Sequence, residues 1–324
     1  MDLLPGPAED RAVARIRPLV DAHLGMDAWS GRLRTGEPVP ATVVAQLTSA
    51  ACRADGVTEA TVVAVVLGRA LAPLEVLAAM VARGRAAFAV PHPTAGYTVF
   101  GPLDAAVVVW VGDDVAVAAA PLTAHSRDGI DPTTPMAHAV LTDRRTLDPS
   151  ASARARSLAA GYLAGLARGA QDLAVEYAKT RVQFDRPIGS NQAVKHALAD
   201  CATRSEAAWA TVLYGATASA EARPDRDFWV AAAAGTAADA ADANARTAIQ
   251  VHGGRGYTIE CPAHLFLARA RLVTQLLGGS PGIRRRLLAR APDACSTRGG
   301  SGRVERASRG VGDVDAVERG AVVA

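Results

Sequence analysis

The chain has 324 residues, of which half are hydrophobic and only 4% are aromatic. A chain of this length can bury a complete core in one large domain or in two to three smaller ones. Its alanine-rich, aromatic-poor composition favours packed helices over a β-sandwich. The 35 basic side chains nearly balance the 32 acidic ones, which gives a net charge of +3. Because no basic face with interleaved aromatics accompanies that charge, the composition argues against nucleic-acid binding.

The sequence predicts a cytoplasmic protein without a membrane segment or a metal site. Its first residues lack the basic and apolar regions of a signal peptide. The apolar stretch 60–82 is interrupted by Arg69, Pro73 and Glu75, so it is not a membrane span. The histidines show no metal-ligand spacing. Neither metal nor disulfide spacing is found among the four cysteines, which are Cys52, Cys201, Cys261 and Cys295.

Residues 1–85 predict an N-terminal helical domain, and residues 86–148 predict a reduced middle β-domain. Between Thr61 and Val81 apolar residues recur at helical spacing, and Pro73 marks a break between two helices. From residue 86 the pattern changes to short β-rich runs at 97–100, 105–111 and 115–119. Gly-Pro and Gly-Asp-Asp turns separate these runs, and an Asp-Gly turn follows them.

Residues 149–291 predict a C-terminal four-helix bundle. Apolar side chains keep three- and four-residue spacing from Leu158 to Tyr177. Further helices are predicted from Gln192, over 227–251 and over about 260–277, with a short fifth from Pro281. Residues 292–324 are rich in Gly, Arg, Ser, Asp and Val without a period, which predicts a disordered tail. The expected fold class is mainly α with a small central β-domain.

Two segments of the helical region carry the strongest functional signal. The first, from Tyr177 to Gly189, reads Tyr-Ala-Lys-Thr-Arg-Val-Gln-Phe-Asp-Arg-Pro-Ile-Gly and leads into Gln192. The second, from Gln250 to Pro262, reads Gln-Val-His-Gly-Gly-Arg-Gly-Tyr-Thr-Ile-Glu-Cys-Pro. An arginine pairs well with phosphate oxygens, and glycines at a helix start let backbone N–H groups reach an anion. Both segments therefore suit a phosphate-bearing cofactor.

The two segments, their order and their spacing resemble those of the acyl-CoA dehydrogenase family, and the resemblance covers residues 60–291. It implies an N-terminal helical domain, a middle β-domain and a four-helix bundle that dimerises, with FAD lying across the subunit interface. Where the family usually has glycine, this chain has Asp185, whose charge near a pyrophosphate is unfavourable unless Arg186 offsets it. The residues implied to hold the adenosine and pyrophosphate half of FAD are Arg181, Gln183, Phe184, Gln192, Gln250, Gly253 and Gly254.

The resemblance also implies a catalytic glutamate, which removes the proton α to the thioester carbonyl while hydride passes to the flavin. The two positions that carry it in the family correspond here to Gly278 and Ala155, and neither residue can accept a proton. Glu260 matches a helix-start residue of the family whose role is structural. The stretch that holds the flavin ring in the family is replaced here by residues 91–97. The chain therefore matches the family at one half of the cofactor site only.

These departures predict a partner subunit of a heteromeric acyl-CoA dehydrogenase. The chain would supply the adenosine and pyrophosphate half of the FAD site. A catalytic acyl-CoA dehydrogenase subunit, in a heterodimer or heterotetramer, would supply the ring pocket and the glutamate that act on the acyl-CoA substrate. Two alternatives stay open, namely a self-sufficient homo-oligomeric enzyme with a relocated base and a flavin-free scaffold. No residue pattern specifies the acyl group.

Overall fold

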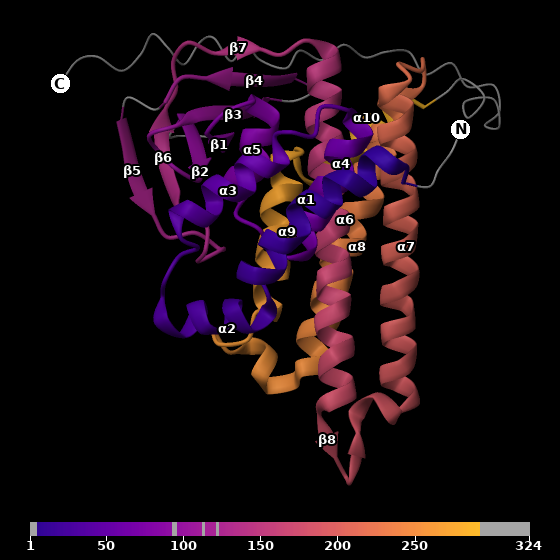
Figure 1. Cartoon of the computed structure of the whole chain (residues 1–324). Coiled ribbons are helices and arrows are strands. Elements are labelled where there is room, and N and C mark those ends of the chain that lie inside the picture. The colour runs from indigo at the N-terminus through magenta and orange to yellow at the C-terminus, as the bar shows by residue number, and fades with distance from the viewer. Residues whose placement is uncertain (1–4, 93–95, 112–113, 121–122, 292–324) are drawn as a thin grey trace. The chain divides into compact units, whose positions relative to one another are not determined.

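The computed structural model describes residues 5–92, 96–111, 114–120 and 123–291, and the residues up to Arg290 form one compact unit (Figure 1). The predicted disordered tail, residues 292–324, lies outside the described residues. The mainly helical class with a small β-domain is confirmed. Within the described ranges, no helix combines the length and the hydropathy that a membrane span requires. In the same ranges, no group of three or more His, Cys, Asp or Glu side chains is arranged to hold a metal ion.

The N-terminal part of the unit is helical. Its helices are α1 (Pro7–His23), α2 (Met26–Thr35), α3 (Ala41–Ala51), α4 (Val57–Arg69) and α5 (Leu74–Ala82). The Glu9 carboxylate accepts a hydrogen bond from the Gly6 N–H at 3.0 Å and so caps the start of α1. As the sequence predicts, Pro73 separates α4 from α5. The indole N–H of Trp29 donates to the Ala70 carbonyl at 3.0 Å, which fixes α2 to the end of α4.

Among the described residues the middle part is a seven-stranded sheet with the strand order β5-β6-β2-β1-β3-β4-β7. β1 and β3 are parallel, and the other neighbouring strands are antiparallel. The predicted runs are confirmed as β2, β3 and β4. The sequence pattern does not predict the other strands separately, because they hold few β-branched and aromatic residues. The strands are β1 (Ala86–His92), β2 (Gly96–Phe100), β3 (Ala106–Val111), β4 (Asp114–Ala118), β5 (Thr123–Arg127), β6 (Met136–Val140) and β7 (Arg145–Thr146).

The two faces of this sheet pack against different partners. Phe88, Val108 and Trp110 belong to the large apolar core that the sheet shares with the helices. Val99 and Val107 belong to a second, smaller apolar cluster. Successive side chains of a strand point to opposite faces, which explains the division. The sheet is therefore fixed to the helices through one face.

The C-terminal part is again helical. Its helices are α6 (Pro149–Thr180), α7 (Gln192–Ala220), α8 (Arg226–His252), α9 (Ala263–Leu276) and α10 (Gly279–Ala289). The long helices α6, α7 and α8 pack against one another, while α9 lies on α6 and α8, and α10 lies on α8 and α9. The buried side of α8 is mostly alanine, as the sequence predicts. The last two helices are short, with 14 and 11 residues, whereas the sequence pattern favours a longer helix from about residue 260.

Glycines bring α4 and α6 into direct backbone contact. A Cβ atom added at Gly165 would lie 2.1 Å from the Val65 carbonyl oxygen, and one added at Gly169 would lie 2.3 Å from the Arg69 carbonyl oxygen. Gly161, one turn earlier on α6, makes a similar close approach to α4. Real Cβ atoms essentially never come within 3.0 Å of such atoms. Along this seam, defined by Gly161, Gly165 and Gly169, no side chain separates the two helices.

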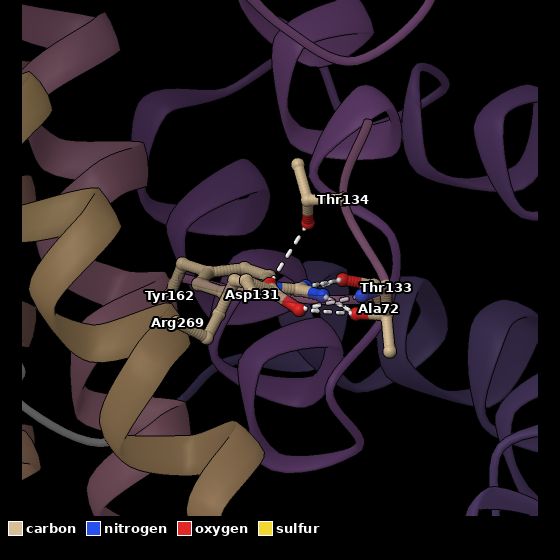
Figure 2. Close-up of polar contacts among 6 residues, drawn as sticks. All are labelled: Ala72, Asp131, Thr133, Thr134, Tyr162 and Arg269. Carbon is tan, nitrogen blue, oxygen red and sulfur yellow. Dashed lines mark hydrogen bonds and ion pairs between the residues drawn. The ribbon is translucent and has the colours of Figure 1, made fainter. Parts of the chain in front are cut away.

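A buried polar network joins α9 to the sheet (Figure 2). Arg269 of α9 is 1% exposed and forms an ion pair with Asp131, which is equally buried in the connection between β5 and β6. The Arg269 guanidinium also donates to the Ala72 carbonyl and the Tyr162 hydroxyl, both at 2.8 Å. It donates further to the Thr133 hydroxyl at 2.7 Å. The network therefore connects α9, α6, the α4–α5 connection and the β5–β6 connection.

The carboxylate of this network, Asp131, has several hydrogen-bond donors. Asp131 accepts hydrogen bonds from the Thr133 N–H at 2.9 Å and from the Thr134 hydroxyl at 2.8 Å. Burial alone raises the pKa of Asp131, but Arg269 and the hydrogen bonds from Thr133 outweigh it and hold the pKa below its ordinary value. A buried ion pair stabilises a fold only when its remaining donors and acceptors are satisfied. Those partners are present here.

Candidate cofactor half-site

The first segment forms the end of α6 and an exposed hairpin. α6 ends at Thr180, and its C-cap is Arg181. The short strands β8 (Val182–Gln183) and β9 (Arg186–Pro187) then pair with each other. The hairpin extends past the ends of α6 and α7 (Figure 1). The hairpin lies there because the chain has to reverse direction between the end of α6 and the start of α7.

The turn of this hairpin presents an apolar side chain to solvent. Phe184 and Asp185 both have positive φ, 52° and 61°, as a two-residue hairpin turn of type I′ requires. This backbone region costs a non-glycine residue about 1–2 kcal/mol. Phe184 is nevertheless 95% exposed and gains no burial in return. A strained backbone at this position marks the turn as a candidate contact with a ligand or a second chain.

Hydrogen bonds hold the base of the hairpin. The Ile188 N–H donates to the Arg181 carbonyl at 2.8 Å. The Arg186 guanidinium donates to the side-chain oxygen of Asn191 at 3.0 Å. Arg186 thus bonds to Asn191 and not to the neighbouring Asp185, so a direct ion pair does not supply the expected charge offset among the described residues. Gln192 follows as the first, exposed residue of α7.

The second segment covers the end of α8 and the turn after it. His252 is the last residue of α8, and the 3₁₀ turn η2 (Gly253–Tyr257) follows. Gly253 has φ 59° and ψ −139°, a conformation open essentially to glycine alone. Gly254 differs, because a Cβ atom added there would meet nothing within 4 Å. Packing inside the chain does not require glycine at 254, whereas close approach of a ligand or a second chain to the backbone would.

A ring contact joins the two segments. The rings of Tyr177 and His252 stack with centroids 4.1 Å apart and planes 19° apart. The His252 Nδ1 lies 2.7 Å from the Ala248 carbonyl oxygen. Burial lowers the pKa of His252, although the bond to Ala248 opposes the effect, and the neighbouring Arg255 lowers the pKa further. His252 is therefore neutral at neutral pH and holds the ends of α6 and α8 together.

The predicted cofactor residues fit one half of an FAD site. The Arg181 side chain has no hydrogen-bond or ion-pair partner among the described residues, so its guanidinium is available to a phosphate. For the ring half the chain offers residues 91–97 in place of the family's stretch. Residues 93–95 of the predicted ring region lie outside the described residues. The exposed set consists of Arg181, Gln183, Phe184, Gln192, Gln250, Gly253 and Gly254.

The two positions expected for a catalytic glutamate have different surroundings. Ala155 is fully buried in the apolar core, so a carboxylate there would be desolvated. Gly278 is exposed at the N-cap of α10 and has φ 86°. Glu260 is exposed and lies before α9, which begins at Ala263. Glu260, the one carboxylate among the three positions, is therefore open to solvent.

Two features of the region are not predicted by the sequence analysis. Arg255 lies within the second segment, but the pattern of that segment assigns it no role. The Arg269–Asp131 pair spans 138 residues of sequence. A charged residue on the otherwise apolar stripe of α9 is the one available signal for Arg269, and Asp131 carries none because it lies in a loop.

Comparisons with known proteins identify relatives of the C-terminal part of the chain. The family model for "Acyl-CoA dehydrogenase, C-terminal domain" matches residues 150–292. Acyl-CoA dehydrogenase FadE34 of Mycobacterium tuberculosis is 44% identical over 161 residues, which cover 48% of this chain and 23% of that protein. Acyl-CoA dehydrogenase IpdE2 of the same organism is 39% identical over 160 residues, which cover 49% of this chain and 48% of that protein. The chain thus spans less than half the length of these curated relatives.

Solved structures share the fold over nearly the whole chain. Butyryl-CoA dehydrogenase from Megasphaera elsdenii has a TM-score of 0.71 at 17% identity and covers 89% of this chain and 99% of its own. A chain of the ChsE4–ChsE5 complex from Mycobacterium tuberculosis has a TM-score of 0.70 at 23% identity, with 90% and 100% covered. Residues 150–292 thus match the C-terminal domain of the acyl-CoA dehydrogenases, a family of FAD-binding flavoproteins, and the chain shares the fold of the solved members.

Proposed function

We propose that this chain is a subunit of a heteromeric acyl-CoA dehydrogenase and binds the adenosine and pyrophosphate half of FAD for a catalytic partner subunit. Bound FAD would supply the oxidising chemistry for the α,β-dehydrogenation of an acyl-CoA thioester, and a base of the partner subunit would take up the proton α to the carbonyl. Arg181 would pair with the pyrophosphate, while Gln250 and the backbone at Gly254 would contact the adenosine side.

One observation carries the proposal. All seven cofactor-side residues lie exposed at helix ends and on the protruding hairpin, whereas the two glutamate positions hold a buried alanine and a glycine. Exposed binding residues without a carboxylate suit a chain that completes the site of another subunit. The same arrangement would leave an independent enzyme without its base.

Exposed apolar side chains beside both segments support an interface. On the hairpin, Val182 is 52% exposed and Phe184 95% exposed. On and after η2, Tyr257 is 77% exposed and Ile259 62% exposed. Exposed apolar side chains next to a binding segment favour contact with another protein. We infer that a partner subunit covers these four side chains together with the cofactor.

The interior of the chain supports the same division of roles. The glycine seam closes α4 against α6 with no side chain between them. The Arg269–Asp131 network closes the junction of α9 and the sheet. A buried, fully bonded charge pair is costly to open. We therefore place the acyl group and the flavin ring in the partner subunit. The ChsE4–ChsE5 complex, which shares the fold, is an assembly of two differently named chains.

Co-expression with a candidate catalytic subunit tests the proposal. We expect the two chains to co-purify as a yellow complex that dehydrogenates an acyl-CoA, while this chain alone shows neither activity nor stoichiometric flavin. In the complex, Arg181→Ala should lower FAD affinity about tenfold or more, because a charge-assisted contact to phosphate is lost. Arg246→Ala, an exposed arginine on the same helix as Gln250, serves as the matched control and should change nothing. Full dehydrogenation by this chain alone would refute the proposal.

Two further experiments separate the alternatives. A self-sufficient enzyme with a relocated base should gain nothing from Gly278→Glu, and it should be active without a partner. Ala155→Glu is unsuitable for this test, because the position is buried in the core and the variant would be destabilised. A flavin-free scaffold should show no flavin absorption in any complex.

A further inference from the structure

Three histidines from three strands gather on one face of the sheet. His138 of β6 lies opposite Thr98 of β2 and opposite His125 of β5. Residues directly opposite each other in paired strands point to the same face. His92 of β1 shares that face, because it follows by two residues Val90, which lies opposite Thr98. His92, His125 and His138 form the histidine cluster.

Two rings of the cluster are in contact. The His92 and His138 ring centroids lie 4.5 Å apart, and the ring planes are tilted by 55°. The Nδ1 atom of His138 lies 3.4 Å from the hydroxyl of Thr98, a buried residue. Both rings are half-buried, whereas His125 is exposed. Two neutral imidazoles can share such a contact, but two imidazolium ions at this separation repel each other.

The charged groups around His138 add to this repulsion. Partial burial lowers the pKa of His138, and three neighbours lower it further, namely His92, Arg127 and His125. Arg127 follows His125 by two residues on β5, so it points to the same face. Among the described residues, the charged groups that act on His138 are therefore cations or become cations in acid.

The helices that pack on β1 offer the cluster no balancing charge. These helices are α5 and α9. α5 contains one acidic residue, Glu75, which lies beside Arg85 and Asp104. α9 contains no acidic residue, and its Arg269 is paired with Asp131. A proton taken up by the cluster is therefore not compensated by a carboxylate from either helix.

The two strands nearest the cluster are attached to the sheet through one pairing. β5 is the edge strand of the described sheet and pairs with β6 (Figure 1). β6 joins the other strands through β2, over the register from Tyr97↔Ala139 to Phe100↔Met136. The connection between β5 and β6 carries Asp131, which is bonded to Arg269 of α9. Repulsion at the cluster therefore acts on the pairing that holds both strands and this connection in place.

We propose that the β5–β6 pair is an acid-sensitive element of the fold, which separates from β2 when the histidine cluster is protonated. At neutral pH His138 is neutral and its contact with the His92 ring persists. Because His138 binds a proton less readily in the folded chain than in the unfolded chain, the pairing loses stability as the pH falls below about 6.5. Asp131 then moves away from α9 together with the connection.

The inference goes beyond the proposed function, since the cluster shares no residue with the cofactor half-site. Hydrogen–deuterium exchange of the full chain at about pH 7.5 and about pH 5.5 tests it, because histidine changes its charge in this range. After correction for the pH dependence of intrinsic exchange, peptides of β5 and β6 should lose protection about tenfold or more in acid. Peptides from the middle of α7 should not change. Equal protection at both pH values, or an equal loss in all elements, overturns the proposal.

Substitution of the histidines shows whether the cluster causes this loss. His138→Gln keeps a side chain that can hydrogen-bond but cannot be protonated, so it should abolish most of the loss. His196→Gln, at an exposed position of α7 outside the cluster, is the matched control and should retain the full loss. If His138→Gln does not fold, His92→Gln tests the same ring contact from β1. An unchanged acid response of the cluster variant overturns the proposal.

A charge reversal distinguishes repulsion from a merely structural role. Arg127→Glu replaces an exposed cation of β5 by a carboxylate, so it should reduce the acid-induced loss several-fold. Arg127→Gln, which only removes the charge, should reduce the loss less. A structural defect would instead lower protection at both pH values. An acid-induced loss that is unchanged or larger in Arg127→Glu overturns the assignment to charge repulsion.

Discussion

At the scale of single residues, the turn of the exposed hairpin combines two unfavourable features. Asp185 adopts a positive φ of 61°, and it brings a negative charge beside the residues that we assign to a pyrophosphate. Aspartate tolerates this backbone region better than most residues, and glycine tolerates it freely. The positive φ explains why glycine suits this position, as in the family that the segment resembles. The charge still opposes an anionic ligand.

Replacing Asp185 should therefore strengthen cofactor binding. We expect Asp185→Asn, which removes only the charge, to tighten FAD binding by the complex several-fold. Asp185→Gly removes the charge and also up to about 1 kcal/mol of turn strain, so it should bind at least as tightly. Fluorescence titration of both variants gives the comparison. Unchanged affinity in both would remove the pyrophosphate from the neighbourhood of this turn.

His252 gives the fold a pH dependence of known sign. Burial lowers the pKa of His252 in the folded chain, so below about pH 6.5 the unfolded chain binds the proton more readily. The free energy of unfolding should therefore fall as the pH drops from 6.5 towards the folded pKa, and it should recover above 6.5. Denaturant titrations at several pH values measure this slope. His252→Gln should flatten it, and an identical slope in both proteins would contradict the assignment.

At the scale of elements, the glycine seam fixes α6 on α4. Gly165→Ala should destabilise the chain by about 1–3 kcal/mol or more, because its Cβ would lie 2.1 Å from the Val65 carbonyl oxygen. Gly31→Ala on α2 is the matched control. Nothing lies within 4 Å of its added Cβ, so the change should stabilise α2 by about 0.5–1 kcal/mol. Equal effects in the two variants, measured by denaturant titration, would contradict the seam.

The buried network should behave as a coupled pair. Arg269→Met leaves the Asp131 carboxylate buried without its cation and should cost about 3–5 kcal/mol. The double variant Arg269→Met with Asp131→Leu should cost less than the sum of the single changes, since no uncompensated charge remains. A double-mutant cycle by chemical denaturation measures this coupling. Additive costs would show that the two side chains do not interact in solution.

Elements with a strong local pattern could be predicted from the sequence, and those that depend on distant partners could not. The break at Pro73 and the alanine face of α8 follow from residues close in sequence. β6 reads Met-Ala-His-Ala-Val and has little strand propensity of its own, so its pairing with β2 decides its structure.

At the scale of the whole molecule, the candidate site also divides into parts that a local sequence pattern predicts and parts that only packing brings together. The two segments are recognisable because each is a contiguous motif, whereas the contact between the Tyr177 and His252 rings that joins them is seen only in the structure. By contrast, a cleft of about 610 Å³ draws its walls from helices far apart in sequence, with Arg17 and Arg255 separated by most of the chain. No local pattern marks such a site, because only packing brings its residues together.

The central claim concerns how one cofactor is divided between two chains, and the flavin content of purified species tests it most directly. We predict one FAD for each pair of different subunits, lost when Arg181→Ala is introduced into this chain, and no stoichiometric FAD in this chain alone. One FAD for each copy of this chain, purified without a partner and active on an acyl-CoA, would contradict the account.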